Sequence, residues 1–143
     1  MTTFVDTSAF YALLCRLDPN HEAARGVLEQ LLSDGATPIT SNYVVVESCA
    51  LIQHRLGMEA LRVFVEDLLG PVRVIWIGPD IHSAAVSVLV IAGRRKLSLV
   101  DCVSFELMRR QRVVDAFCFD EDFASSGFRV RPERIPRESK LRD

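Results

Sequence analysis

The sequence contains no apolar run long enough to cross a membrane and no overall excess of positive charge. Its longest strongly apolar stretch, residues 84–92, is much shorter than the roughly 20 residues that a transmembrane helix needs. The N-terminus has no basic leader and soon reaches Asp6, which argues against a signal peptide. We therefore expect a cytoplasmic protein without a membrane segment. The formal net charge of −2 argues against binding nucleic acid over the whole surface.

The four cysteines and three histidines show none of the spacings that carry chemistry. The four cysteines form no C-x-x-C pair, and each stands in an apolar run, so reduced and buried thiols are expected. The three histidines are scattered, without zinc-ligand spacing or a close pairing suited to acid–base catalysis. We expect them at the surface or at its boundary.

The sequence does contain enough apolar residues for a packed core. The chain has 143 residues, of which 49% are hydrophobic, and this predicts one globular domain. We place the domain at residues 1–132 and a polar C-terminal tail at residues 133–143.

Short β-branched or apolar segments alternate with segments of helical periodicity. We expect strands at residues 3–5, 37–40, 72–77, 116–119 and 128–130. We expect helices at residues 7–17, from after Asn20 to Gly35, at 42–56, across 61–69, after Gly78-Pro79, and from Ser98 to about Arg112. This alternation predicts an α/β fold, with a mostly parallel central sheet flanked by helices in an α/β/α arrangement.

Two acids come directly after predicted strands. Asp6 follows the strand at residues 3–5, and Asp120 follows the strand at residues 116–119. The carboxyl ends of parallel strands meet at one edge of a sheet, where sites form in folds of this class. We therefore expect both carboxylates at that edge.

Two further acids are expected near the same edge. Glu47 stands three residues after Val44 and four before Leu51, so it should point inward from the predicted helix at residues 42–56. A glutamate on an inward face is unfavourable unless it is paired or binds a cation. Asp101 stands near the start of a helix, close to the predicted strands.

Each acid also has a purely structural interpretation. Asp6 and Asp120 fit as N-caps, and Asp101 follows Ser98 by three residues, as in a capping box. Glu47 fits the rim of its helix. The four acids taken together are more informative about function than any one of them, because no obvious basic partner stands beside them in sequence. Two carboxylates 4 Å apart repel by roughly 4 kcal/mol at an effective dielectric constant of about 20, and a divalent cation removes that repulsion. Oxygen ligands favour Mg²⁺ or Mn²⁺ over zinc.

At these residues the sequence resembles the PIN-domain family in four motifs that occur in order. They are VDTS at residues 5–8, TSNY at 40–43 leading to Glu47, LSLVDCVSFELM at 97–108, and CFDEDF at 118–123. The similarity runs from about residue 3 to residue 130. The pattern is most similar to that of VapC-type toxins, which pair with a small antitoxin.

The resemblance implies a metal-dependent endoribonuclease. Its catalytic quartet would be Asp6, Glu47, Asp101 and Asp120. Mg²⁺, or Mn²⁺ in its place, would be bound by Asp6, Asp101 and Asp120, with Glu47 and Asp120 binding a second metal or holding the attacking water. Such a metal ion lowers the pKa of its water and stabilises charge on the phosphate. In-line attack would leave 5′-phosphate and 3′-hydroxyl ends.

Other positions receive supporting roles from the same resemblance. Ser8 and Ser104 match hydroxyl positions of the motifs, whereas Cys118 replaces a threonine that often precedes the last aspartate. Asp122 either assists the metal or caps the short helix after it, and capping is the favoured interpretation. The basic run of Arg94, Arg95 and Lys96 is expected to hold RNA phosphates at the border of the groove.

The expected partners are an RNA substrate, a cognate small antitoxin and a second copy of the chain, since apolar helix surface is abundant. Other functions stay open: a PIN nuclease for housekeeping RNA processing or for DNA, or a non-catalytic module that binds RNA or protein. The intact quartet argues against the non-catalytic module. A phosphatase with an aspartyl nucleophile is disfavoured, because Ser8 stands where a second aspartate is usual.

Overall fold

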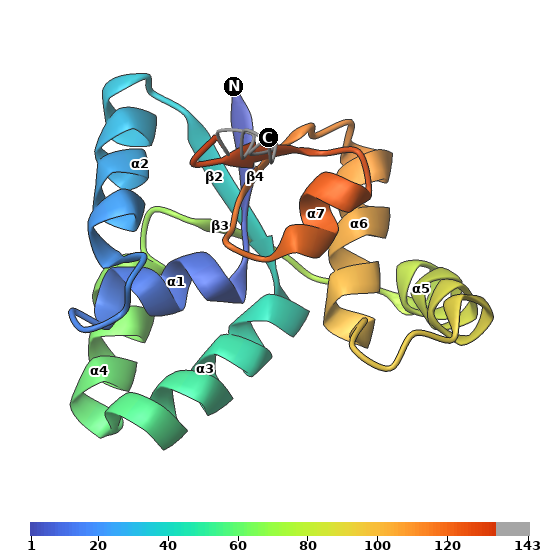
Figure 1. Ribbon diagram of the computed structural model, residues 1–143, viewed down its shortest axis with the longest axis horizontal. Coiled ribbons are helices and arrows are strands. Elements are labelled where there is room, and N and C mark those ends of the chain that lie inside the picture. Colours follow the sequence, from blue (N-terminus) through green and yellow to red (C-terminus); the bar gives the residue numbers. More distant parts are fainter. Residues whose placement is uncertain (134–143) are drawn as a thin grey trace, which may run out of the picture.

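A five-stranded sheet runs through the middle of the computed structural model, which describes residues 1–133 (Figure 1). The strands are β1 (Thr2–Val5), β2 (Thr37–Ser41), β3 (Arg73–Ile75), β4 (Asp115–Phe117) and β5 (Arg129–Arg131). They are ordered β3-β2-β1-β4-β5, and every neighbouring pair is parallel. The prediction of a mostly parallel central sheet is confirmed.

Helices cover the sheet on two sides. They are α1 (Thr7–Leu14), α2 (His21–Ser33), α3 (Asn42–Leu56), α4 (Met58–Val63), α5 (Pro79–Ala92), α6 (Leu99–Gln111) and α7 (Glu121–Ser125), with a π-helical turn η1 (Phe64–Leu68) after α4. Figure 1 shows α1, α2 and α4 on one side of the strands and α6 and α7 on the other, with α5 outside α6. The α/β/α arrangement is thus confirmed.

The core is built around phenylalanines and apolar residues from both helical layers. Phe4 of β1 stacks on Phe123 of α7, and Phe10 of α1 meets Phe64 of η1 edge to face. These four rings are fully buried. Burial of a large aromatic side chain stabilises a fold by about 1.5–3 kcal/mol, so these contacts fix the helices that carry the site against the sheet.

Some element boundaries differ from the predictions. The first helix ends at Leu14 and not at Leu17, because the backbone leaves the helical region at Cys15, and Leu17 is 95% exposed. The strand expected at residues 72–77 is only three residues long. The helix expected across residues 61–69 continues after Val63 as a π-helical turn, which shifts the helical phase and leaves Val65 half exposed. Leu32 of α2 is also exposed.

Other expectations concern single residue types. All four cysteines are free thiols, as predicted; Cys102 and Cys118 are buried, whereas the other two are half-buried. His54 and His82 are exposed and His21 is half-buried, which confirms their expected positions. Within residues 1–133, no helix is both long enough and apolar enough to span a membrane. The expected polar tail lies outside the described residues, apart from Glu133.

Candidate metal centre

The carboxyl ends of β1 and β4 lie side by side at the centre of the sheet. Val5 and Phe117 are paired in register, and the backbone N–H of Asp6 donates to the carbonyl of Phe117 at 3.0 Å. The loops that leave these strands therefore start together. This geometry brings Asp6, after β1, and Asp120, after β4, to the same edge of the sheet, as the strand-end argument predicts.

Asp6 is nearly fully buried at the start of α1. Its Oδ2 atom accepts hydrogen bonds from the Ser8 hydroxyl at 2.7 Å and from the Ser8 N–H at 3.2 Å, so it is the N-cap of α1. Burial raises the pKa of Asp6 to about 6; the Ser8 hydrogen bonds oppose this rise, and the Glu47 and Asp120 carboxylates add to it. Asp6 is both a cap and a member of an acidic cluster.

Ser8 connects the two loops. Its hydroxyl donates to Asp6 and accepts a hydrogen bond from the N–H of Phe119 at 2.9 Å. Because Phe119 directly precedes Asp120, Ser8 fixes both acids relative to each other. The position matched from the first motif is therefore directly involved in the geometry of the cluster.

Asp101 reaches the cluster from the start of α6. Its backbone N–H donates to the Ser98 hydroxyl at 3.0 Å, and its Oδ2 accepts from the Ser98 N–H at 3.4 Å, which completes the predicted capping box. Burial, followed by the Asp120 and Asp6 carboxylates, raises the pKa of Asp101 to about 6. The cap orients the carboxylate, and the neighbouring acids make its charged form unfavourable.

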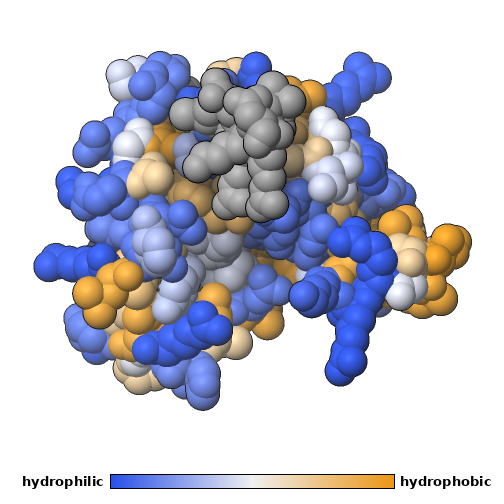
Figure 2. Space-filling model, in the orientation of Figure 1, coloured by the Kyte–Doolittle hydropathy of each residue, from blue (hydrophilic) through white to orange (hydrophobic). Residues whose placement is uncertain are grey.

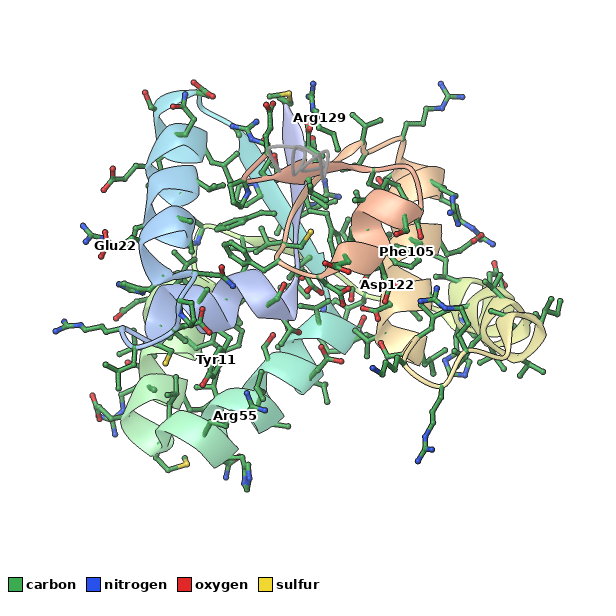
Figure 3. All side chains as sticks on the ribbon, in the orientation of Figure 1. Tyr11, Glu22, Arg55, Phe105, Asp122 and Arg129 are labelled. Carbon is green, nitrogen blue, oxygen red and sulfur yellow. The ribbon has the colours of Figure 1, made fainter. Side chains whose placement is uncertain are left out.

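Asp101, Asp120 and Asp122 offer carboxylate oxygens that all lie within 4.8 Å of one another. Asp120 caps α7, because its Oδ1 accepts from the N–H of Asp122 at 2.9 Å. The favoured interpretation of Asp122 as the cap is therefore wrong. Asp122 instead lies in the first turn of α7 and forms an ion pair with Arg94 at 3.0 Å. Figure 3 shows its side chain in the region between α7 and α6.

Glu47 lies at the flank of the buried face of α3. The fully buried residues of that helix are Val44, Ser48 and Ile52, so Glu47 is half-buried, less inward than predicted. Burial raises the pKa of Glu47, a hydrogen bond from Thr7 lowers it, and the Asp101 and Asp120 carboxylates raise it further. Glu47 thus interacts with the cluster from the α3 side.

Threonine side chains that the sequence analysis did not single out hold this edge together. The Thr7 hydroxyl contacts Glu47, donates to the carbonyl of Val44 at 3.5 Å and accepts from Ser48 at 3.0 Å. The Thr40 hydroxyl donates to the carbonyl of Val5 at 2.8 Å. Both threonines could have been found from the sequence, because they belong to the motif segments VDTS and TSNY.

Ser104 and Cys118 have local contacts. Ser104 is buried, and its hydroxyl donates to the carbonyl of Val100, one turn back in α6, at 2.8 Å. The Cys118 thiol lies 3.8 Å from the carbonyl oxygen of Ala116 and 3.9 Å from that of Asp120. The sulfur thus makes a weak contact with the backbone of the Asp120 loop, where a threonine would donate a stronger bond.

The basic run lies in the loop between α5 and α6. Arg94, Arg95 and Lys96 are all exposed, and Arg94 reaches the acids through its ion pair with Asp122. The cluster is otherwise acidic and lined by carboxylate oxygens, which is the donor set that Mg²⁺ and Mn²⁺ prefer. The arrangement therefore fits a divalent cation bound by Asp101, Asp120 and Asp122, and the Asp6 and Glu47 carboxylates interact electrostatically with this group.

Comparison with known families and proteins identifies the family of the domain. Residues 3–128 match the model of the PIN domain. The chain belongs to the PIN-domain family. It is 36% identical over 132 residues to the 23S rRNA-specific endonuclease VapC20 of Mycobacterium tuberculosis, in both strains H37Rv and CDC 1551, and the match covers 91% of this chain and 98% of that protein.

Solved structures show the same fold. The crystal structure of M. tuberculosis VapC20, described as a Sarcin-Ricin loop cleaving toxin, matches with a TM-score of 0.77 and 33% identity, over 88% of this chain and 95% of that one. VapBC2 from Rickettsia felis, bound to a DNA fragment from its promoter, matches with a TM-score of 0.66 and 13% identity over 89% and 94%. FitAcB from Neisseria gonorrhoeae matches with 0.61 and 16% over 90% and 95%.

Proposed function

We propose that this protein is a VapC-type toxin, a Mg²⁺-dependent endoribonuclease of a type II toxin–antitoxin pair that acts in the cytoplasm. The observation that carries the proposal is the group of carboxylate oxygens of Asp101, Asp120 and Asp122 within 4.8 Å of one another, on a PIN fold. Mn²⁺ should substitute for Mg²⁺, since both prefer oxygen ligands. The similarity to VapC20 over nearly its full length supports the toxin assignment.

The residues of the site divide into metal ligands and positioning groups. Asp6, Asp101 and Asp120 would hold the metal, and Asp122, whose carboxylate lies within 4.8 Å of those of Asp101 and Asp120, would assist them. The metal would supply an acidified water and charge stabilisation on the phosphate when bound. Ser8 orients Asp6 through its 2.7 Å hydrogen bond. Glu47, oriented by Thr7, would hold the attacking water or a second metal. Hydrolysis would be in line and would leave 5′-phosphate and 3′-hydroxyl ends.

The proposed substrate is ribosomal RNA. The relative with 36% identity is described as specific for 23S rRNA, and the match spans nearly all of both chains. Arg94, Arg95 and Lys96 would hold phosphates of the RNA at the edge of the site. Arg94 is the best placed of the three, because its guanidinium already lies 3.0 Å from Asp122.

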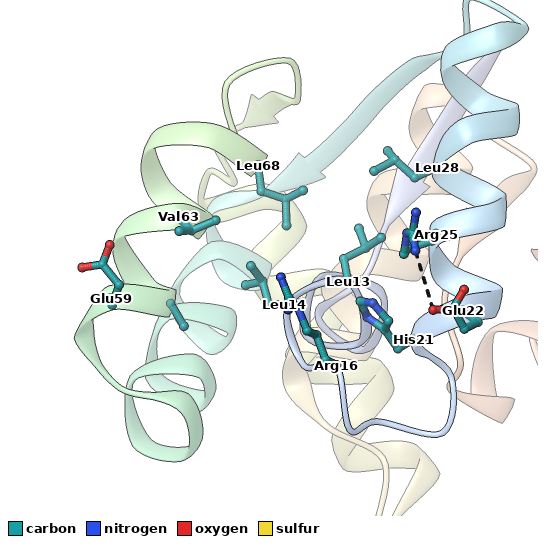
Figure 4. Close-up of a pocket in the computed structure, with 11 residues that line it drawn as sticks. Leu13, Leu14, Arg16, His21, Glu22, Arg25, Leu28, Glu59, Val63 and Leu68 are labelled. Carbon is teal, nitrogen blue, oxygen red and sulfur yellow. Dashed lines mark ion pairs between the residues drawn. The ribbon is translucent and has the colours of Figure 1, made fainter.

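The antitoxin is proposed to bind at a pocket that has a volume of about 870 Å³ and lies among α1, α2 and α4 (Figure 4). Its floor is apolar and its rim is charged, as the lining residues show: Leu13, Leu14, Leu28, Val63 and Leu68, with Arg16, Glu22, Arg25 and Glu59. This combination suits an amphipathic helix from a small partner protein.

The same antitoxin would silence the acids with a basic side chain. A guanidinium satisfies two carboxylate oxygens at once. An arginine or lysine of the antitoxin could therefore pair with Asp6, Asp101 or Asp120, displace the metal and block RNA. The ion pair between Arg94 and Asp122 supports this proposal, since it places a guanidinium next to the same acidic cluster.

A homodimer is also proposed. Helix α5 packs mainly on α6 and exposes a row of apolar side chains to solvent: Val86, Val88, Val90 and Ile91. Figure 2 shows this apolar surface at the end of the molecule formed by α5. Exposed apolar helix surface of this kind is typical of protein–protein interfaces, and two-fold dimers are the commonest assemblies of identical chains.

The toxin assignment is tested by producing the protein in bacteria. We expect wild-type protein alone to arrest growth, and both the Asp6→Ala variant and co-expression of the adjoining small gene to relieve the arrest. Equal amounts of wild type and variant must be verified on blots. Wild-type protein that is harmless at high level would contradict the toxin function and leave a general nuclease function standing.

A further inference from the structure

A small pocket opens between the start of α3 and the start of α6, next to the acids. Its volume is about 280 Å³, and its lining residues are Asn42, Tyr43, Val46, Glu47 and Val100. Glu47 belongs to this pocket and also interacts with Asp101 and Asp120, and Val100 directly precedes Asp101. The pocket and the candidate metal centre therefore share a wall.

The lining combines apolar surface with a few polar groups. Val46 is 69% exposed on α3, and Val100 is half-buried at the start of α6. The Oδ1 atom of Asn42 accepts a hydrogen bond from the N–H of Ile77 at 2.7 Å, which fixes the orientation of its amide. The Asn42 amide then presents donors, and the Glu47 carboxylate presents acceptors, beside the valines.

Tyr43 adds an aromatic surface that is held in place. Its hydroxyl forms a hydrogen bond with Nδ1 of His82 on α5, and the two rings lie 5.9 Å apart at an angle of 48°. A ring fixed from behind loses little conformational freedom when a ligand packs against it.

We propose that this pocket binds one nucleobase of the RNA, from a nucleotide next to the scissile phosphate. The inference rests on the proposed function, since it needs the phosphate at the acids. Proteins hold unstacked RNA bases on aromatic and apolar surfaces and read their edges with a few hydrogen bonds. The Glu47 carboxylate repels a phosphate from the pocket itself, whereas the N–H groups of the Asn42 amide, whose Oδ1 atom is held by Ile77, can donate hydrogen bonds to the edge of a base. The pocket is the specificity subsite of the nuclease.

The test combines base removal in the RNA with substitution in the pocket. A short RNA that contains the mapped cut is made with an abasic ribose at each position beside that cut. Wild type, Val46→Ser and Tyr43→Leu are compared, with Val114→Ser as the control. Val114 is an equally apolar residue, 60% exposed, that precedes β4 at the opposite edge of the sheet.

For wild type, we expect removal of one base to lower kcat/KM about tenfold, mainly through KM, as the loss of one stacked base does. The same removal should change kcat/KM little for Val46→Ser or Tyr43→Leu, because the pocket of these variants no longer binds that base. Val114→Ser should behave as wild type. The fluorescence of a 2-aminopurine at the same position should change when the RNA binds the inactive Asp101→Asn variant, and adding Val46→Ser should remove that change.

Two results would overturn the subsite while leaving the nuclease intact. In the first, kcat/KM on the abasic RNA falls by the same factor for wild type and for the pocket variants. In the second, the pocket substitutions weaken antitoxin binding and leave the effect of base removal unchanged. The second result would make the pocket a protein contact. If wild type cuts no RNA with Mg²⁺ present, the proposed function fails, and the subsite fails with it.

Discussion

Ser8 donates a 2.7 Å hydrogen bond to Oδ2 of Asp6 and so aligns the acid that follows β1 with the loop that follows β4, whose Phe119 N–H donates to the same hydroxyl. A single hydroxyl therefore links the two acidic loops. Its removal should therefore affect both stability and catalysis.

For Ser8→Ala we expect a loss of about 1–2 kcal/mol in the free energy of unfolding, since each lost hydrogen bond contributes about 1 kcal/mol. The pKa of Asp6 should rise further without the donor, so that more Mg²⁺ is needed for half-maximal cleavage at pH 7. Urea denaturation and a Mg²⁺ titration of cleavage measure the two effects. Ser87→Ala, which removes an exposed hydroxyl on α5, is the control. Unchanged Mg²⁺ dependence would argue that Ser8 has only a structural role.

Asp101 has two roles that substitutions can separate. Asp101→Asn keeps an oxygen that accepts from the Ser98 N–H but removes a charge close to Asp120 and Asp6. We expect this variant to lose cleavage and to be as stable as the metal-free wild type, or more stable. Asp101→Ala should also lose cleavage and should be destabilised by about 0.5–2 kcal/mol, as for a lost cap. An active Asn variant would remove Asp101 from the proposed ligands.

Arg94 and Arg95 form a matched pair of neighbours. Both are exposed, but Arg94 is the one that pairs with Asp122 at the acidic cluster. Arg94→Ala should lower RNA affinity about fivefold, the equivalent of 1 kcal/mol, whereas Arg95→Ala should have a smaller effect. The difference should shrink as salt is raised, because exposed charges are screened. Filter binding at two salt concentrations, with an inactive background, measures it. Equal losses would show that the ion pair does not position Arg94 for RNA.

The raised pKa values of Asp6 and Asp101, each about 6 against an ordinary value of 3.8, predict the pH dependence of the metal-free protein. These two carboxyl groups hold their protons more tightly in the folded state than in the unfolded chain. Their contribution to the free energy of unfolding is therefore fully present at low pH and is lost as the pH rises through 6. In EDTA, the protein should gain about 1 kcal/mol per carboxyl from these groups between pH 7.5 and pH 5.

With Mg²⁺ present the trend should reverse, because protons compete with the metal for the same oxygens. Cleavage should therefore decline as pH falls through about 6. Denaturation curves in EDTA and in Mg²⁺ over this range measure both trends, and Asp101→Asn should show a weaker pH dependence in EDTA. Stability in EDTA that rises with pH between 5 and 7.5 in wild type, and equally in the variant, would contradict the raised pKa values that burial and the neighbouring acids give to Asp6 and Asp101.

Part of the site could be predicted because the carboxyl ends of neighbouring parallel strands meet at one edge of a sheet. Asp6 and Asp120 follow short buried strands, and adjacent parallel strands necessarily bring such residues to one edge. The capping pattern of Ser98 and Asp101 is local and was visible for the same reason. The fold class followed from the alternation of apolar strands and amphipathic helices.

Other features depend on contacts between distant segments and were not predictable from the sequence. Arg94 and Asp122 are 28 residues apart, and their ion pair depends on how α7 packs beside the loop before α6. Asp115, buried at the start of β4, pairs with Arg129 of β5, and neither was singled out. The π-helical turn changes which side chains after α4 face the core, and the spacing of apolar residues in the sequence does not predict this turn.

The acids are proposed to bind a divalent cation on which RNA cleavage by the protein depends. Cleavage of total RNA with end mapping tests this dependence most directly. Purified wild type with Mg²⁺ or Mn²⁺ should cut RNA to 5′-phosphate and 3′-hydroxyl ends, and EDTA, Ca²⁺ alone or Asp120→Asn should abolish the cut. A discrete cut within 23S rRNA is the result expected from the proposed substrate. Undiminished cleavage in EDTA, or by Asp120→Asn, would contradict the account.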